Sequence, residues 1–168
     1  MKKLDKNFYT KSAIEIAPLL LGKLFCHKID GKIYKYLITE TECYYGIDDT
    51  ASHAYRGITN RNKIMYEEGG VSYIYLCYGI HHLFNVVTGP KDHPEAVLIR
   101  GIENASGPGR VTKLLNIDKS FNGSSLINSN LIWIEDDGFI PKYTTSKRIG
   151  IDYATKEYIN KKWRFLVK

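Results

Sequence analysis

A strand, turn and strand in the middle of the chain constrain the fold more than any other feature. The segments SYIYLCYG (residues 72–79) and LFNVVTG (residues 83–89) are rich in β-branched and aromatic residues, and they meet near Gly79. A third apolar run, EAVLIRGIE (residues 95–103), predicts a buried strand. The connections are short and helices do not alternate regularly with strands, so the sequence predicts an α+β domain rather than a doubly wound parallel sheet.

The other predicted elements follow one another without an internal repeat, a low-complexity block or a linker, so we expect a single domain over residues 1–168. Helices are predicted at residues 12–22, 59–70 and 107–117, a helical or irregular segment at 151–162, and further strands at 32–45, 130–135 and 163–167. In the first helix Ser12 and Glu15 have capping-box spacing, and Pro18 strains the helix.

Cysteine spacing and hydropathy limit the class of protein. Cys26, Cys43 and Cys77 form no C-x-x-C pair, which suggests neither a disulfide framework nor a cysteine-rich zinc site. No apolar run approaches the roughly 20 residues that cross a bilayer, and the N-terminal segment lacks the apolar core of a secretory signal. We therefore expect a cytoplasmic protein with no membrane partner.

The net charge of +6 is unevenly distributed. Residues 142–168 hold eight Lys or Arg against Asp152 and Glu157, which alone gives +6, and residues 1–33 add +4, so the middle of the chain carries −4. A basic frame around an acidic centre suits an enzyme that acts on a polyanion, because the frame can bind phosphates while carboxylates react. The alternative is that surface lysines only aid solubility.

The strand at residues 32–45 carries the most suggestive carboxylates. Side chains alternate along a strand, so Glu40, Glu42 and Tyr44 share one face and Thr41 and Cys43 lie on the other. If the first face lines a pocket, Glu42 is a candidate general base and Tyr44 a stacking surface. Periodicity alone favours the alternative, in which this face is exposed to solvent.

Tyrosine is concentrated in the same region, because nine of the 13 tyrosines fall between Tyr34 and Tyr78. Tyr73 and Tyr75 share a strand face, and Tyr78 immediately precedes the turn glycine. An aromatic side chain that projects from a hairpin tip could be inserted between DNA bases. For Tyr73 and Tyr75, half-buried packing on a sheet is the commoner situation.

Two cationic features could contact a phosphate or a reacting water. Arg100 interrupts an apolar run, and a buried cation needs a carboxylate, a phosphate or a water as its partner. A purely structural ion pair remains an equal alternative. The turn GPGR at residues 107–110 could direct backbone N–H groups and Arg110 toward a phosphate, although such a turn is also an ordinary loop.

The histidines show no metal-binding spacing. No H-x-x-x-H or H-E-x-x-H motif links them, and nothing in the spacing argues for a site built from Asp48, His53 and His81. We therefore predict no metal and no cofactor.

Taken together, seven segments resemble the alkyladenine (3-methyladenine) DNA glycosylase family. They occur in family order and cover nearly the whole chain: LLGKLF, ITETECYYGIDDTASHAYRG, RNKIMY, YIYLCYGIHHLFNVV, AVLIRGIE, GPGRVTKLLNI and RIGI. The resemblance implies a curved, mostly antiparallel sheet with flanking helices and a protruding β-hairpin. It also implies a monofunctional enzyme of base excision repair that flips alkylated or deaminated purines out of duplex DNA and hydrolyses the bond between base and sugar, without lyase activity.

The same resemblance implies roles for individual residues. Glu42 matches the general base that activates water, and Arg100 matches a residue that helps to hold this water or the adjoining phosphate. Tyr78 matches the residue that fills the gap left in the duplex. The base pocket is implied by three further aromatic positions and one amide, which are Tyr44, His53, Tyr75 and Asn85.

Double-stranded DNA containing a damaged purine is the expected partner, bound by a monomer. The expected phosphate contacts are Arg61, Asn62, Gly109, Arg110 and Lys113. Two alternatives stay open: a lesion-binding module without catalysis, and a metal-dependent nuclease built from Asp48, Asp49 and histidines.

Overall fold

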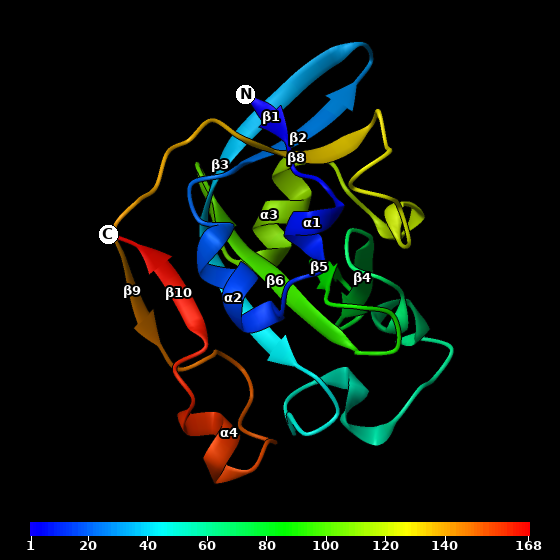
Figure 1. The fold of residues 1–168 in the computed structure, drawn as a ribbon, viewed down its shortest axis with the longest axis vertical. Helices are drawn as coiled ribbons and strands as arrows, with labels where there is room; N and C mark the ends of the chain where they lie inside the picture. Colours follow the sequence, from blue (N-terminus) through cyan, green and yellow to red (C-terminus); the bar gives the residue numbers. More distant parts are fainter.

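The long strand β3 (Lys32–Tyr45) organises the sheet in the computed structural model, which describes residues 1–168 (Figure 1). Its first part pairs with β2 (Leu24–Ile29), and its second part pairs with β6 (Glu95–Ile102). The register shifts between Ile38 and Thr41, where β3 changes neighbours. One strand therefore connects two halves of the sheet, and Glu42 lies in the second half.

All strand pairings are antiparallel, in the order β1-β8-β2-β3-β6-β5-β4, with β10 pairing β3 and β9, and β7 pairing β6. The sheet does not close on itself, and the predicted α+β class is confirmed. The remaining strands are β1 (Lys2–Lys3), β4 (Ser72–Cys77), β5 (His81–Thr88), β7 (Ala105–Ser106), β8 (Ile132–Asp136), β9 (Tyr143–Ser146) and β10 (Arg164–Val167).

The helices are short. They are α1 (Lys6–Tyr9), α2 (Ala13–Leu19), α3 (Pro108–Leu114) and α4 (Lys156–Asn160), with 3₁₀ turns at Lys63–Tyr66, Lys119–Phe121 and His53–Arg56. The capping box of Ser12 and Glu15 is present at the start of α2, and Pro18 lies in its last turn. None of the helices has the length and hydropathy needed to cross a membrane.

The short helix predicted at residues 59–70 forms only as the 3₁₀ turn Lys63–Tyr66, and Thr59 is not its N-cap. The reason is local: Thr59 N–H donates to Asn62 Oδ1 and Asn62 N–H donates to Thr59 Oγ1, which stabilises a turn instead of a helix start. The strand β2 was not predicted, because its six residues include Cys26, His27 and Lys28 and show no clear alternation.

The sheet has two differently packed faces. A core of 24 buried residues lies under α2 and α3 and includes Cys43, while Thr41 donates its hydroxyl to Ala17 O of α2 at 2.7 Å. The other face carries a small cluster of Ala54, Met65, Tyr73, Val87 and Ala96. Since side chains alternate along β3, Glu40, Glu42 and Tyr44 extend from the second face, as the sequence predicts.

Candidate active site

Glu42 is fully buried on β3 and is held by several donors. Its Oε1 accepts the Ile149 N–H at 2.8 Å, its Oε2 accepts the Tyr44 hydroxyl at 3.0 Å, and Arg100 Nε lies 3.6 Å from Oε1. Burial raises the pKa of this carboxyl, and Arg100 opposes that rise. The solvent-exposed alternative favoured by periodicity is therefore wrong, because Glu42 is fully buried and the backbone at Ile149 binds its carboxylate, while β10 pairs with the edge of β3.

Arg100 has a carboxylate partner on each side. Its Nε donates to Glu40 Oε1 at 3.1 Å, closer than its approach to Glu42. Glu40 Oε1 also accepts Arg164 Nε at 2.5 Å. The ion pair left open by the sequence thus exists, and it lies directly beside the carboxylate proposed as the base.

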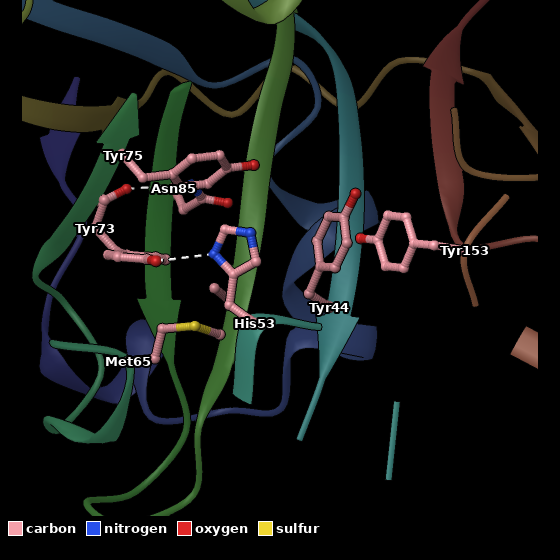
Figure 2. Close-up of a pocket in the computed structure, with 8 residues that line it drawn as sticks. Tyr44, His53, Met65, Tyr73, Tyr75, Asn85 and Tyr153 are labelled. Carbon is pink, nitrogen blue, oxygen red and sulfur yellow. Dashed lines mark hydrogen bonds between the residues drawn. The ribbon is translucent and has the colours of Figure 1, made fainter. Parts of the chain in front are cut away.

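A pocket opens on the second face of the sheet beside Tyr44, the residue whose hydroxyl binds Glu42 (Figure 2). The empty space in this pocket, including the part open to solvent, is about 310 Å³. Eight residues line it: Tyr44, His53, Met65, Tyr73, Tyr75, Asn85, Ala96 and Tyr153. All four residues expected in the base pocket are therefore brought together. A concave site with flat rings and few polar groups suits a planar aromatic ligand.

His53 and Tyr75 form one wall of this pocket. Their ring centroids are 4.4 Å apart, which leaves no room for a base between them, and His53 Nδ1 bonds the Tyr73 hydroxyl at 2.9 Å. Burial, with a smaller contribution from Arg61, lowers the pKa of His53 to about 4. The imidazole is therefore neutral near pH 7 and does not repel a cationic ligand.

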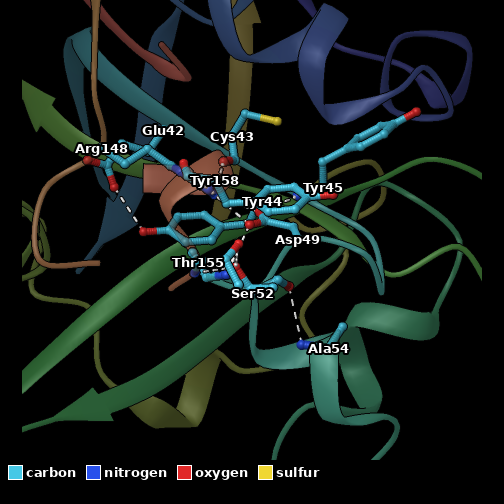
Figure 3. A network of polar contacts seen from close by, with 12 residues as sticks. Glu42, Cys43, Tyr44, Tyr45, Asp49, Ser52, Ala54, Arg148, Thr155 and Tyr158 are labelled. Atoms are coloured by element: carbon cyan, nitrogen blue, oxygen red, sulfur yellow. Dashed lines mark hydrogen bonds and ion pairs between the residues drawn. The ribbon is translucent and has the colours of Figure 1, made fainter. Parts of the chain in front are cut away.

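Tyr44 lies across the pocket from His53 in Figure 2 and is supported from behind by a cation. The Arg148 guanidinium carbon is 4.9 Å from the Tyr44 ring and 5.0 Å from the Trp163 ring. Asp49 holds Arg148 by two bonds of 2.6 and 2.9 Å, and both side chains are fully buried (Figure 3). Tyr44 on one side and the His53–Tyr75 wall on the other therefore line the same pocket.

Asn85 is one of the residues that line the pocket, and Tyr78 is not. Asn85 is almost fully buried, and its amide donates to Tyr73 O at 3.2 Å. Tyr78 is 92% exposed at the tip of the β4–β5 hairpin and has a φ of 52°. A bulky residue in this region of φ is strained, and strain without packing is a feature of functional positions.

A family model described as Methylpurine-DNA glycosylase (MPG) matches residues 7–106 and 103–168 of this chain. The chain belongs to this family. Curated relatives named "Putative 3-methyladenine DNA glycosylase" are similar throughout. The one from Borreliella afzelii is 44% identical over 178 residues, covering 98% of this chain and 96% of that protein. The one from Desulfitobacterium hafniense is 37% identical over 198 residues, covering 100% and 96%. The resemblance predicted from sequence motifs is confirmed.

The five expected phosphate contacts of this methylpurine-DNA glycosylase family member lie in different settings. Arg61 is exposed beside the pocket, with its guanidinium carbon 5.2 Å from the Tyr75 ring. Arg110 and Lys113 are exposed on α3, whose residue Gly109 packs closely against His81 of the hairpin.

Asn62, another of the expected phosphate contacts, has its side chain bonded within the protein. It is 2% exposed, and its amide donates to His53 O and Gly57 O at 2.9 Å each. The Asn62 side chain therefore holds the loop behind His53 and is not free to bind a phosphate.

Sequence reasoning missed several residues of this glycosylase-family site. Tyr153 lines the pocket and donates its hydroxyl to Ala51 O at 2.7 Å, while Asp49 and Arg148 support Tyr44. The sequence around Asp49 does not predict this ion pair, because the cation that pairs with Asp49 is 99 residues away. The motif RIGI was recognised, but spacing alone gave no reason for Ile149 N–H to bond Glu42.

The residues of the alternative metal site are not grouped in the structure. No three His, Cys, Asp or Glu side chains form a group that could hold a metal ion, so Asp48, His53 and His81 do not come together in this way.

Proposed function

We propose that this protein is a monofunctional DNA glycosylase that removes alkylated or deaminated purines from duplex DNA. The observation that carries the proposal is the buried Glu42 carboxylate, held by Ile149 N–H and the Tyr44 hydroxyl at the edge of an aromatic pocket. Family membership and the printed names of the relatives support the same class of reaction.

Recognition begins with extrusion of the damaged nucleotide from the stack, which costs a few kcal/mol and least where pairing is already weak. The base enters between Tyr44 and the His53–Tyr75 wall, and Tyr78 fills the gap in the duplex. Stacking of about 1–3 kcal/mol per base offsets part of the cost. A purine alkylated on a ring nitrogen is cationic and interacts favourably with the faces of electron-rich tyrosines. Asn85 opposes the exocyclic amine of normal guanine.

In the chemical step, the oxygen of a water attacks C1′ of the sugar and the C1′–N bond breaks, its electron pair leaving with the base. Glu42 accepts a proton from the water, and its negative charge stabilises the positive charge that develops on the sugar. The raised pKa of Glu42 makes this carboxylate a stronger base than one in water. Arg100 positions the water or the adjoining phosphate.

A cationic base leaves without prior protonation, because breaking the bond neutralises it. A neutral base such as hypoxanthine needs a proton from another source. No lysine lines the pocket, so no amine is at hand to form a covalent adduct with the sugar. We therefore expect free base and an intact DNA backbone as products.

The test is base release from defined duplexes, each containing 3-methyladenine, 7-methylguanine, hypoxanthine or ethenoadenine, beside an undamaged control. We expect release of at least one damaged base, unaffected by EDTA, without strand cleavage. Binding of the lesion duplex without release would favour the lesion-binding module, and EDTA-sensitive strand cleavage would favour the nuclease. Covalent trapping of DNA by borohydride in useful yield would overturn the monofunctional assignment.

A further inference from the structure

Glu40 is a buried carboxylate next to the proposed catalytic pair, and it has no role in the reaction described above. It lies two residues before Glu42 on the same face of β3 and is 7% exposed. One oxygen, Oε1, receives both Arg100 Nε at 3.1 Å and Arg164 Nε at 2.5 Å. A buried carboxylate shared by two arginines is costly to desolvate, so its retention needs an explanation.

The contact of Arg100 and Arg164 with the same Glu40 oxygen determines how Arg100 approaches Glu42. Arg100 uses Nε for Glu40, and the same Nε stays 3.6 Å from Glu42 Oε1, beyond a good hydrogen bond. Arg164 anchors Glu40 from the other side and is itself bonded to Ser146 Oγ of β9 at 3.1 Å. The anchor therefore extends from the site into β10 and β9.

The four side chains alternate in sign in the order Glu42, Arg100, Glu40, Arg164 and sum to zero formal charge. If Glu40 were absent, Arg100 could move into a direct bond with Glu42 and neutralise it. A base that is directly paired with a guanidinium has a lower pKa and is weaker.

We propose that Glu40, anchored by Arg164, is a positioning residue that holds Arg100 away from Glu42 and so keeps Glu42 basic. This inference rests on the proposed function, in which Glu42 activates water. Glu40 does not touch the substrate and acts through Arg100.

Glu42 is faced by titratable and hydrogen-bonding groups from several elements. Those that face it are the Tyr44 hydroxyl on β3, Arg100 on β6, Tyr75 on β4, and Arg148, Tyr153 and the Ile149 N–H on the C-terminal segment. Burial raises the pKa of each of these three tyrosines above its ordinary value, so they stay neutral across the useful range. Arg100 and Arg148 are therefore the cations that act directly on Glu42, and Arg164 acts on it through Glu40.

A merely structural ion pair and a positioning role predict different results. Loss of Glu40 lets Arg100 approach Glu42 and removes a like charge about 7 Å away along the strand. The acid limb of the pH–rate profile should then move to lower pH. Loss of Arg164 leaves Glu40 to pair with Arg100 alone and takes away a positive charge, so the limb should move to higher pH. A structural defect lowers activity without shifts of opposite sign.

The experiment compares Glu40→Gln, Arg164→Gln and Glu40→Asp with the wild type, using single-turnover base release from pH 4 to 8. We expect Glu40→Gln to shift the acid limb down by about one pH unit and to lower the plateau about tenfold, with the Kd for DNA changed less than about twofold. Arg164→Gln should shift the limb up by a smaller amount. Glu40→Asp keeps the charge and should leave the limb near its wild-type position.

An unshifted acid limb in Glu40→Gln, or shifts of the same sign in both Gln variants, would overturn the proposal. Glu68→Gln is the control, since Glu68 forms an exposed surface pair with Lys6. If Glu40→Gln does not fold, Arg164→Gln and Glu40→Asp still decide the matter.

A carbon-13 NMR titration of Glu42 separates this inference from the proposed function. A lower Glu42 pKa in Glu40→Gln supports the positioning role even if no base is released. An unchanged Glu42 pKa contradicts the positioning role even if the wild type proves to be an active glycosylase.

Discussion

The ion pair behind Tyr44 offers the sharpest test of how the pocket is held together, through the substitution Asp49→Asn. Asp49 Oδ1 accepts Arg148 Nη2 and the Ala51 N–H, and Oδ2 accepts Arg148 Nη1 and the Tyr45 N–H. An asparagine in the same position keeps one oxygen, and its amide group faces two donors. The substitution thus leaves Arg148 buried with an unbalanced charge.

The magnitude follows from the burial of both partners. Removing one member of a fully buried ion pair costs about 3–5 kcal/mol, because the other charge is left without compensation. For a domain of this size 1 kcal/mol corresponds to about 2–4 °C, so the Tm should fall by roughly 6–20 °C. Tyr44 should also lose its support, which weakens the pocket at temperatures where the variant is still folded.

Urea unfolding followed by circular dichroism measures this change, and thermal unfolding checks it. Asp48→Asn is the matched control, because Asp48 is the adjacent carboxylate and is exposed. It should alter the free energy of unfolding by less than about 0.5 kcal/mol. A loss below about 1 kcal/mol in Asp49→Asn, or equal losses in both variants, would refute the reasoning.

Three further predictions concern pH, the hairpin tip and salt. The folded-state pKa of His53, about 4, lies below its ordinary value of 6.5, so the unfolded chain binds the proton more tightly. The lowered pKa therefore contributes to the free energy of unfolding in full above pH 6.5. As the pH falls toward 4, about 2–3 kcal/mol of that contribution is lost. His53→Gln should remove that component in urea unfolding at pH 4.5 and 7, and an identical pH dependence in both proteins would contradict it. Tyr78→Gly should relieve the backbone strain at φ 52° and raise the free energy of unfolding by up to about 1 kcal/mol. The same substitution should slow base release several-fold. An unchanged rate of base release would show that the exposed Tyr78 ring has no role on DNA. Affinity for duplex DNA should fall steeply between 50 and 200 mM salt as counterion release weakens, and a flat fluorescence-anisotropy titration would exclude phosphate contacts as a main source of binding.

Much of the fold could be predicted because its strands carry strong local signals. The runs that form β4, β5 and β6 are apolar and β-branched, and the Ser12–Glu15 capping box forms as predicted. The strand β2 lacked such a signal, and the 3₁₀ turn at Lys63–Tyr66 depends on side-chain bonds that helix propensity does not describe.

The candidate site was only partly accessible from sequence because its environment comes from distant segments. Periodicity placed Glu42 and Tyr44 on one face but could not tell whether anything covered it. The backbone that binds Glu42 belongs to Ile149, 107 residues further along the chain, and the strand that pairs with this part of β3 is the C-terminal β10. The pairing of Asp49 with Arg148 is equally non-local, so no window of sequence around Asp49 contains the reason for its burial.

The central claim is that Glu42 activates water in a pocket that binds a damaged base, and the substitution Glu42→Gln tests it most directly. Glutamine keeps the shape and one acceptor oxygen for Ile149 N–H, so folding and lesion binding should persist. Loss of a general base lowers the rate by about 10²- to 10⁴-fold. We therefore predict that Glu42→Gln binds lesion duplex with a Kd within about threefold of wild type and releases base at least about 100-fold more slowly in single turnover, with Glu68→Gln behaving as wild type. Release by Glu42→Gln at a rate close to that of the wild type would contradict the account.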